Sequence, residues 1–320
     1  MLVDLQTCLP DLRCPRHRVK LVPKGNDRLV SDCADTADVL EYPVVDGMPI
    51  LIDFRNSILD EEATIKSGGK SVIKRNKYGG IFGPIKNMLS PQKKTTRDNI
   101  SALMLELKKR AAPRQLLMIG GGSIGQGMEP LYADPDIHIY AFDIYGSPNI
   151  QFVADAHQIP MPDDFFDAVV IQAVLEHVLQ PSEVVAEIWR VLKNDGLVYA
   201  ETPFMQQVHE GAYDFTRFTE SGHRYLFRRF EVMRSGASGG PGIQFMWSID
   251  YLVRSLFRSR TAGKLAKLLF FWVQYLDALI PADYAIDAAS GVFFLGRKAQ
   301  TMVRPSSMAG YYQGAQKRQH

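Results

Sequence analysis

The chain has 320 residues, 46% of them hydrophobic and 10% aromatic, which is enough for a large core in one large and one small domain. Lysine and arginine number 37 against 35 aspartates and glutamates, so the overall charge gives no argument for a nucleic-acid partner, and we expect no DNA binding. The first ten residues lack the features of a secretory signal, and the three cysteines lie within the first 33 residues. Both observations favour the cytoplasm.

Residues 1–55 are predicted to form a small β-rich module. Short β-like runs lead to the segment 42–52, where an Asp-Gly turn signal separates two apolar runs and Pro43 and Pro49 suit edge strands. Residues 56–98 are polar, basic and punctuated by glycine, with no sustained periodicity. We therefore predict a partly disordered linker between this module and the rest of the chain.

Residues 99–300 are predicted to form a second, α/β domain. Helices are expected at about 99–111, directly after the glycines that follow residue 119, and at 181–193; apolar strands are expected at 115–119, 137–143, 150–155, 166–171 and 197–201. Such alternation predicts a parallel sheet covered on both faces. Further strands at 230–233 and 291–296 flank a helical insertion or lid at 243–283, and the tail 301–320 is expected to be unstructured.

A glycine-rich turn is the strongest functional signal. The apolar strand at 115–119 is followed by Gly120, Gly122 and Gly125, and Asp143 ends the next strand. Glycines allow a nucleoside ligand to approach the backbone, and an acidic side chain about 20 residues on can hold a ribose diol. This spacing fits both NAD and S-adenosylmethionine. Asp155 ends the third strand, where a carboxylate could accept a hydrogen bond from an adenine amino group, and it favours S-adenosylmethionine.

Residues 113–204 then resemble the class I S-adenosylmethionine-dependent methyltransferases of the ubiquinone/menaquinone-biosynthesis type. The resemblance rests on segments 152–156, 159–160 and 165–167, on Ala173-Val174-Leu175-Glu176-His177-Val178, and on 187–193 with Gly196. It implies a Rossmann-like, seven-stranded sheet of order 3-2-1-4-5-7-6 with the last-numbered strand antiparallel. The cofactor residues that it implies are Gly120, Gly121, Gly122, Gly125, Asp143, Ile144, Asp155, Ala156 and Gln172.

One position departs from this family. Met118 stands two residues before the first glycine, where the family often has an acidic side chain. The departure predicts either a weaker hold on the methionine amino group of the cofactor or a substitute residue from elsewhere.

The predicted acceptor site follows the fifth strand and contains His209, Asp214 and Arg217. A histidine can take a proton from an acceptor hydroxyl or amine as the methyl group arrives. A similar pattern occurs in methyltransferases that resemble those of bacterial polysaccharide and natural-product pathways. The alternative is that Asp214 and Arg217 only pair to fix a loop. His177 follows Glu176 at the start of a helix in this resemblance, so we expect a structural role for it.

The N-terminal module contains Cys14, His17 and Cys33, and with residues 42–51 it resembles the zinc-ribbon-like domain that accompanies many methyltransferases. A structural zinc site needs four ligands. Only three are obvious, and Cys8, Asp32 and Asp35 are imperfect substitutes. We therefore expect a degenerate ribbon without metal.

These observations predict methyl transfer from S-adenosylmethionine to an oxygen or nitrogen of a small molecule or saccharide. The alternatives are an RNA methyltransferase, an NAD-dependent oxidoreductase, and a non-catalytic binding protein of the same fold. Residues 243–283 carry five basic side chains around an apolar run that is too short to span a bilayer. This insertion is expected to be a lid or homodimer surface, with peripheral membrane contact as the alternative.

Overall fold

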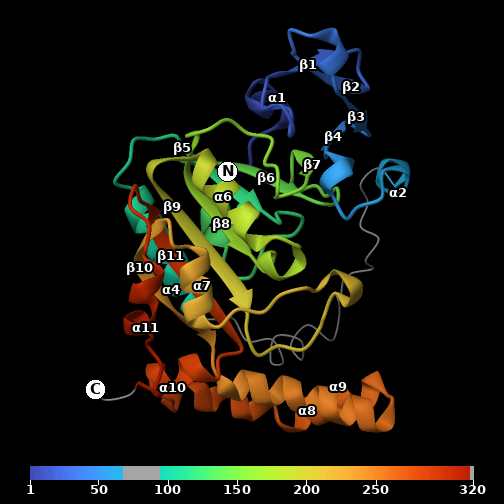
Figure 1. Cartoon of the computed structure of the whole chain (residues 1–320). Coiled ribbons are helices and arrows are strands. Elements are labelled where there is room, and N and C mark those ends of the chain that lie inside the picture. The colour runs from blue at the N-terminus through green and yellow to red at the C-terminus, as the bar shows by residue number, and fades with distance from the viewer. Residues whose placement is uncertain (68–93, 318–320) are drawn as a thin grey trace.

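The computed structural model describes residues 1–67 and 94–317. Four strands precede residue 60, namely β1 (Leu21–Lys24), β2 (Arg28–Ser31), β3 (Glu41–Val45) and β4 (Met48–Leu51). Seven strands follow, namely β5 (Arg114–Ile119), β6 (Ile137–Asp143), β7 (Phe152–Ala154), β8 (Phe166–Gln172), β9 (Leu192–Pro203), β10 (Phe230–Gly239) and β11 (Gly291–Lys298). They form one sheet in the order β1-β2-β3-β4-β7-β6-β5-β8-β9-β11-β10 (Figure 1).

The seven strands from β5 onward have the predicted order. Counted from β5, their sequence is 3-2-1-4-5-7-6, and β11 is antiparallel to both β9 and β10. The predicted total of seven strands is wrong, because β4 pairs with β7 in parallel and adds the N-terminal strands to the same sheet. In this pairing, Ile50 lies opposite Val153 and Leu51 lies opposite Ala154.

The reason for this extension lies in the residues of β4. Ile50 and Leu51 are fully buried, and they belong to the two hydrophobic clusters on opposite faces of the sheet. Strand β7, which would otherwise be an edge strand, is completely buried as well. Pairing with β4 therefore satisfies the backbone groups at this edge, which would otherwise be open to association.

Helices cover both faces of the sheet. One face packs against α6 (Pro181–Val191) and α7 (Glu220–Leu226), and the other packs against α4 (Lys94–Leu107) and α5 (Glu129–Ala133). In β5, Leu117 and Ile119 belong to the first cluster, whereas Leu116 and Met118 belong to the second. Alternate strand residues point to opposite faces, so a continuous apolar strand is required at the centre of the sheet.

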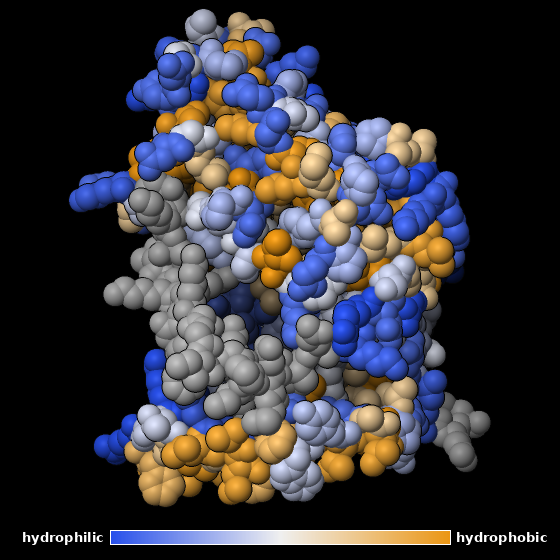
Figure 2. All heavy atoms as spheres, turned by 180° about the vertical axis from the view of Figure 1, so that it is seen from behind, coloured by the Kyte–Doolittle hydropathy of each residue, from blue (hydrophilic) through white to orange (hydrophobic). Residues whose placement is uncertain are grey.

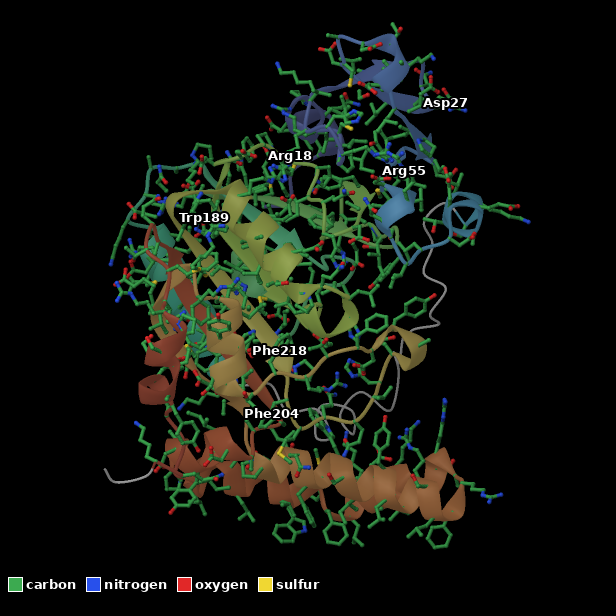
Figure 3. The ribbon with its side chains drawn as sticks, viewed as in Figure 1. Arg18, Asp27, Arg55, Trp189, Phe204 and Phe218 are labelled. Atoms are coloured by element: carbon green, nitrogen blue, oxygen red, sulfur yellow. The ribbon has the colours of Figure 1, made fainter. Side chains whose placement is uncertain are left out.

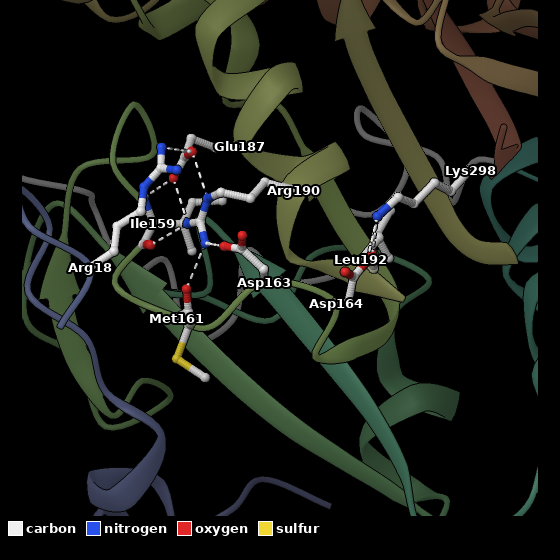
Figure 4. A network of polar contacts seen from close by, with 9 residues as sticks. All are labelled: Arg18, Ile159, Met161, Asp163, Asp164, Glu187, Arg190, Leu192 and Lys298. Atoms are coloured by element: carbon white, nitrogen blue, oxygen red, sulfur yellow. Dashed lines mark hydrogen bonds and ion pairs between the residues drawn. The ribbon is translucent and has the colours of Figure 1, made fainter. Parts of the chain in front are cut away.

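Ion pairs tie the N-terminal part to α6. Arg18 donates a hydrogen bond to Glu187 at 3.2 Å, and Arg190 donates to the same carboxylate at 2.6 and 2.7 Å (Figure 4). Glu187 also accepts from the Ile159 amide at 3.0 Å. Because the Glu187 and Arg190 side chains are only 10% exposed, this network fixes the loop after β7 against α6.

Two expected boundaries differ from the structure. α4 begins at Lys94, five residues before the predicted start, and the helix expected directly after the glycines is the short α5, which begins only at Glu129. Gly127 has a φ of +87°, a left-handed conformation that interrupts a helix at this point. The predicted linker also contains the helix α2 (Glu61–Lys66), while residues 68–93 lie outside the described part.

The tail was predicted to be unstructured, and this is wrong for residues 301–317. They contain η7 (Pro305–Ser307) and α11 (Met308–Tyr311). The Tyr311 hydroxyl bonds to Glu220 and to Ser235, and Arg224 lies over its ring at 5.6 Å. The Tyr312 hydroxyl and the Ala315 amide also donate to Asp287, so several contacts anchor a segment that has no periodic pattern of its own.

α7 contains a buried histidine with a testable effect on stability. His223 is 1% exposed among the rings of Phe218, Phe227 and Phe294, and burial lowers its pKa to about 3. The unfolded chain, with a histidine pKa near 6.5, takes up this proton first. The free energy of unfolding should therefore decrease as pH falls from about 6.5 toward 3.

Replacing His223 with phenylalanine should remove this contribution. Between pH 7 and pH 5, the wild type should lose about 2 kcal/mol more stability than His223→Phe. Urea titrations of both proteins at the two pH values measure this difference, and all other titrating groups are shared. Equal losses in the two proteins would mean that His223 does not stay neutral in the folded state.

Candidate active site

A cavity of about 760 Å³ lies at the carboxyl ends of the central strands. In parallel sheets of this kind, this edge is where ligands bind. Of the residues predicted from the sequence, the cavity is lined by Gly120, Gly125, Asp143, Ile144, Asp155, Ala156, Gln172 and His209. The structure therefore brings His209 and all the predicted cofactor residues except Gly121 and Gly122 to one cavity.

The glycine turn is held by the end of β6. The amides of Gly120 and Gly121 donate to the Phe142 carbonyl at 3.0 and 2.9 Å, and Gly120 has a φ of +76°. The amide of Gly122 donates to Asp143 Oδ2 at 2.9 Å. A Cβ atom at Gly122 would lie 2.6 Å from the same oxygen, so only glycine permits this approach.

Asp143 is 8% exposed and lines the cavity. Its second oxygen, Oδ1, accepts from the Ile144 amide at 2.7 Å. Each oxygen of a carboxylate has further lone-pair capacity, so a ribose diol can still be bound there. The backbone bonds fix the carboxylate in place before any ligand arrives.

The second predicted cofactor carboxylate, Asp155, is held by its own neighbours. It accepts from the Ser57 hydroxyl at 2.8 Å, from the His157 amide at 3.0 Å, and contacts His157 Nδ1 at 2.6 Å. Burial raises the pKa of Asp155, but the bonds from His157 outweigh burial and lower it. Asp155 is thus ionised near neutral pH and remains a hydrogen-bond acceptor beside the cavity.

The wall near Asp155 includes a segment that sequence reasoning missed. Residues 58–60, 63, 64 and 67 line the cavity, and the helix α2 provides several of them. They lie within the predicted linker, whose polar composition and missing periodicity gave no signal of a binding role.

Glu201 also lines the cavity and was likewise missed by sequence reasoning. It ends the apolar part of β9 and is 3% exposed. Gln172 donates to its Oε2 at 2.7 Å, while Thr96 and Tyr199 donate to its Oε1, each at 2.6 Å. A Cβ atom at Gly125 would collide with the Gln172 amide oxygen. An acidic residue at the end of an apolar strand was the signal that could have revealed it.

His209 and its neighbours form the other end of the cavity. His209 Nδ1 lies 3.2 Å from Asp214 Oδ2, and this oxygen also accepts from the His209 amide at 2.9 Å. Arg217 forms a two-point ion pair with Asp214 and donates to the carbonyls of Gln206 and Gln207. The Asp214–Arg217 pair therefore fixes this loop, and Asp214 also contacts the ring of His209.

The charge of Asp214 follows from these contacts. Burial raises its pKa, but the bonds from Arg217 and from the His209 amide more than offset burial, and the pKa falls to about 2. A carboxylate next to Nδ1 favours the histidine tautomer that carries its proton there. The Nε2 atom of His209 is then available to accept a proton.

Glu176 and His177 lie beside His209. Glu176 Oε1 is 3.6 Å from His177 Nε2 and 3.9 Å from His209 Nε2, while His177 Nδ1 donates to the Tyr213 carbonyl at 2.7 Å. Within the described ranges, these three residues are the one group of such side chains whose ligand atoms all lie within 4.8 Å, so they could hold a metal ion. Burial lowers the pKa of His177.

The three residues Cys14, His17 and Cys33 of the expected zinc-ribbon-like module lie next to one another. The His17 amide donates to Cys14 Sγ at 3.4 Å, and Cys33 Sγ lies 3.4 Å from His17 Nδ1. Cys14 Sγ also lies 3.2 Å from the Tyr42 hydroxyl. Cys14 is fully buried in the hydrophobic cluster. Its thiol therefore packs as part of the core of this region.

The chain is similar to known methyltransferases. Residues 117–200 match the family described as "Methyltransferase domain". The demethylmenaquinone methyltransferase of Renibacterium salmoninarum is 36% identical over 143 residues, which cover 41% of this chain and 56% of that protein. The chain thus spans little more than half the length of this curated relative.

Solved structures to which the chain is similar include Haemonchus contortus phosphoethanolamine N-methyltransferase 2 in complex with S-adenosyl-L-methionine. That structure has a TM-score of 0.42 at 14% identity, covering 88% of this chain and 71% of the other. The YcgJ protein of Bacillus subtilis has a TM-score of 0.39 at 15% identity, covering 64% of this chain and all of that one.

Proposed function

We propose that the protein transfers the methyl group of S-adenosylmethionine to an oxygen or nitrogen of a small molecule or saccharide, with a cytoplasmic location. The observation that carries this proposal is the position of His209. Its Nδ1 is held by the ionised Asp214, and its ring lines the same cavity as Asp143 and Gly120. The clustered cysteines, which favour a reducing compartment, support the location.

The residues of the cavity fit the cofactor. Gly120 and Gly125 bring the backbone to the cavity, and three buried or nearly buried carboxylates, Asp143, Asp155 and Glu201, also line it. We assign the ribose to Asp143, the adenine to Asp155, and the methionine ammonium to Glu201. Glu201 thus replaces the acidic side chain that is missing at Met118. When bound, S-adenosylmethionine supplies a methyl group that is already activated for displacement.

The chain itself has to align the acceptor and remove its proton. Methyl displacement requires an in-line approach, which positioning can accelerate strongly. His209 Nε2 takes the proton from the acceptor hydroxyl or amine, and Asp214 stabilises the imidazolium that forms. Arg217 acts through Asp214 and is a positioning residue.

The test is methyl transfer into extracts of cells that lack the gene. The purified protein is incubated with S-adenosylmethionine labelled in its methyl group, and the products are separated into water-soluble metabolites, saccharides, lipids and RNA. Label in a metabolite, saccharide or lipid-linked saccharide supports the proposal. Label in RNA would favour the RNA methyltransferase, and no incorporation despite tight cofactor binding would favour a non-catalytic protein.

Because Glu176, His177 and His209 could hold a metal ion, the same experiment is repeated with a strong chelator. If His209 accepts the proton directly, a strong chelator should leave the rate unchanged. A rate that the chelator abolishes and a divalent ion restores would instead make His209 a metal ligand, because a coordinated nitrogen cannot accept the proton.

A further inference from the structure

The helices α8 (Pro241–Phe257), α9 (Arg260–Leu269) and η6 (Phe271–Leu279) form a layer at the end of the molecule opposite β1, which we call the helical layer (Figure 1). Its outer surface is rich in apolar side chains, visible as an orange band along the bottom of Figure 2. Eight large hydrophobic side chains of the layer are 51–79% exposed, namely Leu252, Leu256, Phe257, Leu265, Leu269, Trp272, Tyr275 and Leu279. Solitary exposed apolar residues are ordinary, but a continuous group marks a binding surface.

Polar and small residues take part in the contacts between the helices of this layer. Asp250 is 8% exposed, accepts from Arg254 at 3.0 Å, and lies so close to Gly263 that a Cβ atom there would collide with it. Met246 of α8 is fully buried, so apolar contacts contribute as well. Many other large apolar side chains of the layer remain exposed to solvent, and side chains extend outward from these helices along the bottom of Figure 3.

Basic residues lie at the turn between α8 and α9. Arg258, Arg260 and Lys264 are exposed there, next to Leu256 and Phe257. Trp272 and Tyr275 add aromatic side chains to the apolar surface. Apolar residues with aromatic and basic neighbours are typical of segments that lie in the headgroup region of an anionic bilayer.

We propose that the outer face of the helical layer docks on an anionic membrane surface. None of the helices in the described ranges has the length and apolar character that crossing a bilayer requires. The layer therefore lies along the surface, with Leu256, Phe257 and Trp272 inserted among the lipids and Arg258 and Arg260 at the phosphates. The basic turn between α8 and α9 is attracted to an anionic lipid surface. A second copy of the chain would bring another basic turn against it, so charge favours the membrane over a dimer.

The same helices reach the active site from their inner side. Trp247 of α8 lines the cavity, Gln207 donates to Ser248 at 3.1 Å, and Tyr251 donates to the Val208 carbonyl at 2.7 Å. The loop that carries His209 thus rests on α8. Resting on the proposed function, this contact suits an amphiphilic acceptor whose polar head enters the cavity while its apolar part remains in the membrane.

The experiment is sedimentation of the full chain with vesicles. Vesicles of phosphatidylcholine alone are compared with vesicles of equal parts phosphatidylcholine and phosphatidylglycerol. Binding should require the anionic lipid and weaken with added salt. The double variant Leu256→Gln, Phe257→Gln should bind about a hundredfold less, since each buried apolar side chain contributes about tenfold or more. Arg258→Gln with Arg260→Gln should lose the preference for anionic vesicles.

Leu105→Gln, at an equally exposed leucine of α4, is the matched control and should bind vesicles as the wild type does. Binding of S-adenosylhomocysteine by every variant separates loss of docking from loss of the cofactor site or the fold. Equal sedimentation of the wild type and the Leu256, Phe257 variant would overturn the proposal. A wild-type dimer that this variant converts to a monomer, without vesicle binding, would assign the surface to a second copy instead.

Discussion

Asp143→Ala should weaken binding of S-adenosylhomocysteine by at least about a hundredfold, because two charge-assisted hydrogen bonds to the ribose diol are lost. Asp143 also holds the amides of Gly122 and Ile144, so the glycine turn loses its anchor at the same time. Isothermal titration calorimetry of the wild type and the variant measures the change directly.

Two further variants separate binding from folding. Asp143→Asn retains one acceptor oxygen and should bind with intermediate affinity. Asp27→Ala removes an exposed carboxylate from the turn between β1 and β2, far from the cavity, and should bind like the wild type (Figure 3). Unchanged affinity in a folded Asp143→Ala protein would refute the assignment of the ribose to this carboxylate.

His209→Gln should lower the rate of methyl transfer by about 10²- to 10⁴-fold, the usual contribution of a positioned general base. Binding of S-adenosylhomocysteine should remain unchanged, because the residues assigned to the cofactor lie at the ends of strands, whereas His209 lies in the loop after β9. The rate is measured with labelled S-adenosylmethionine and the acceptor fraction that the wild type methylates.

Asp214→Asn and His17→Gln complete this series. Asp214→Asn keeps the size of the side chain but removes the charge beside Nδ1, so its rate should fall less than that of His209→Gln. His17 lies in the N-terminal region and its replacement should leave the rate unchanged. Since the pKa of Asp214 is about 2, a loss of activity between pH 7 and pH 5 would come from a different group. If the His209→Gln enzyme had the wild-type rate, His209 would not be the proton acceptor, and its loop would only position the acceptor.

The sequence allowed much of the central domain to be predicted, for identifiable reasons. The strand 137–143 was predicted with the same bounds as β6, because it is a nearly continuous apolar run that ends at Asp143. The order of the seven strands came from the resemblance of residues 113–204, which the match to a methyltransferase domain supports. Local patterns and a familiar succession of motifs were sufficient there.

Contacts between distant segments could not be predicted. The pairing of β4 with β7 joins Ile50 to Val153, about a hundred residues apart, and the pattern Ile50-Leu51-Ile52 reads equally well as the end of a separate module. Likewise, the role of Ser57 beside Asp155 depends on where the chain after β4 runs. Glu201 was overlooked because Gln172 and Thr96, which hold it, come from two other elements.

The course of the chain after β4 has a consequence for how the protein acquires its activity. Because β4 is hydrogen-bonded to β7, and the residues after β4 lead to Ser57 beside Asp155, this end of the cavity is built by the N-terminal segment together with the later strands. An isolated methyltransferase domain starting at residue 94 would lack one wall of its own pocket and would present β7 as a bare edge. The N-terminal strands and the domain that follows should therefore be expressed and engineered as a single unit.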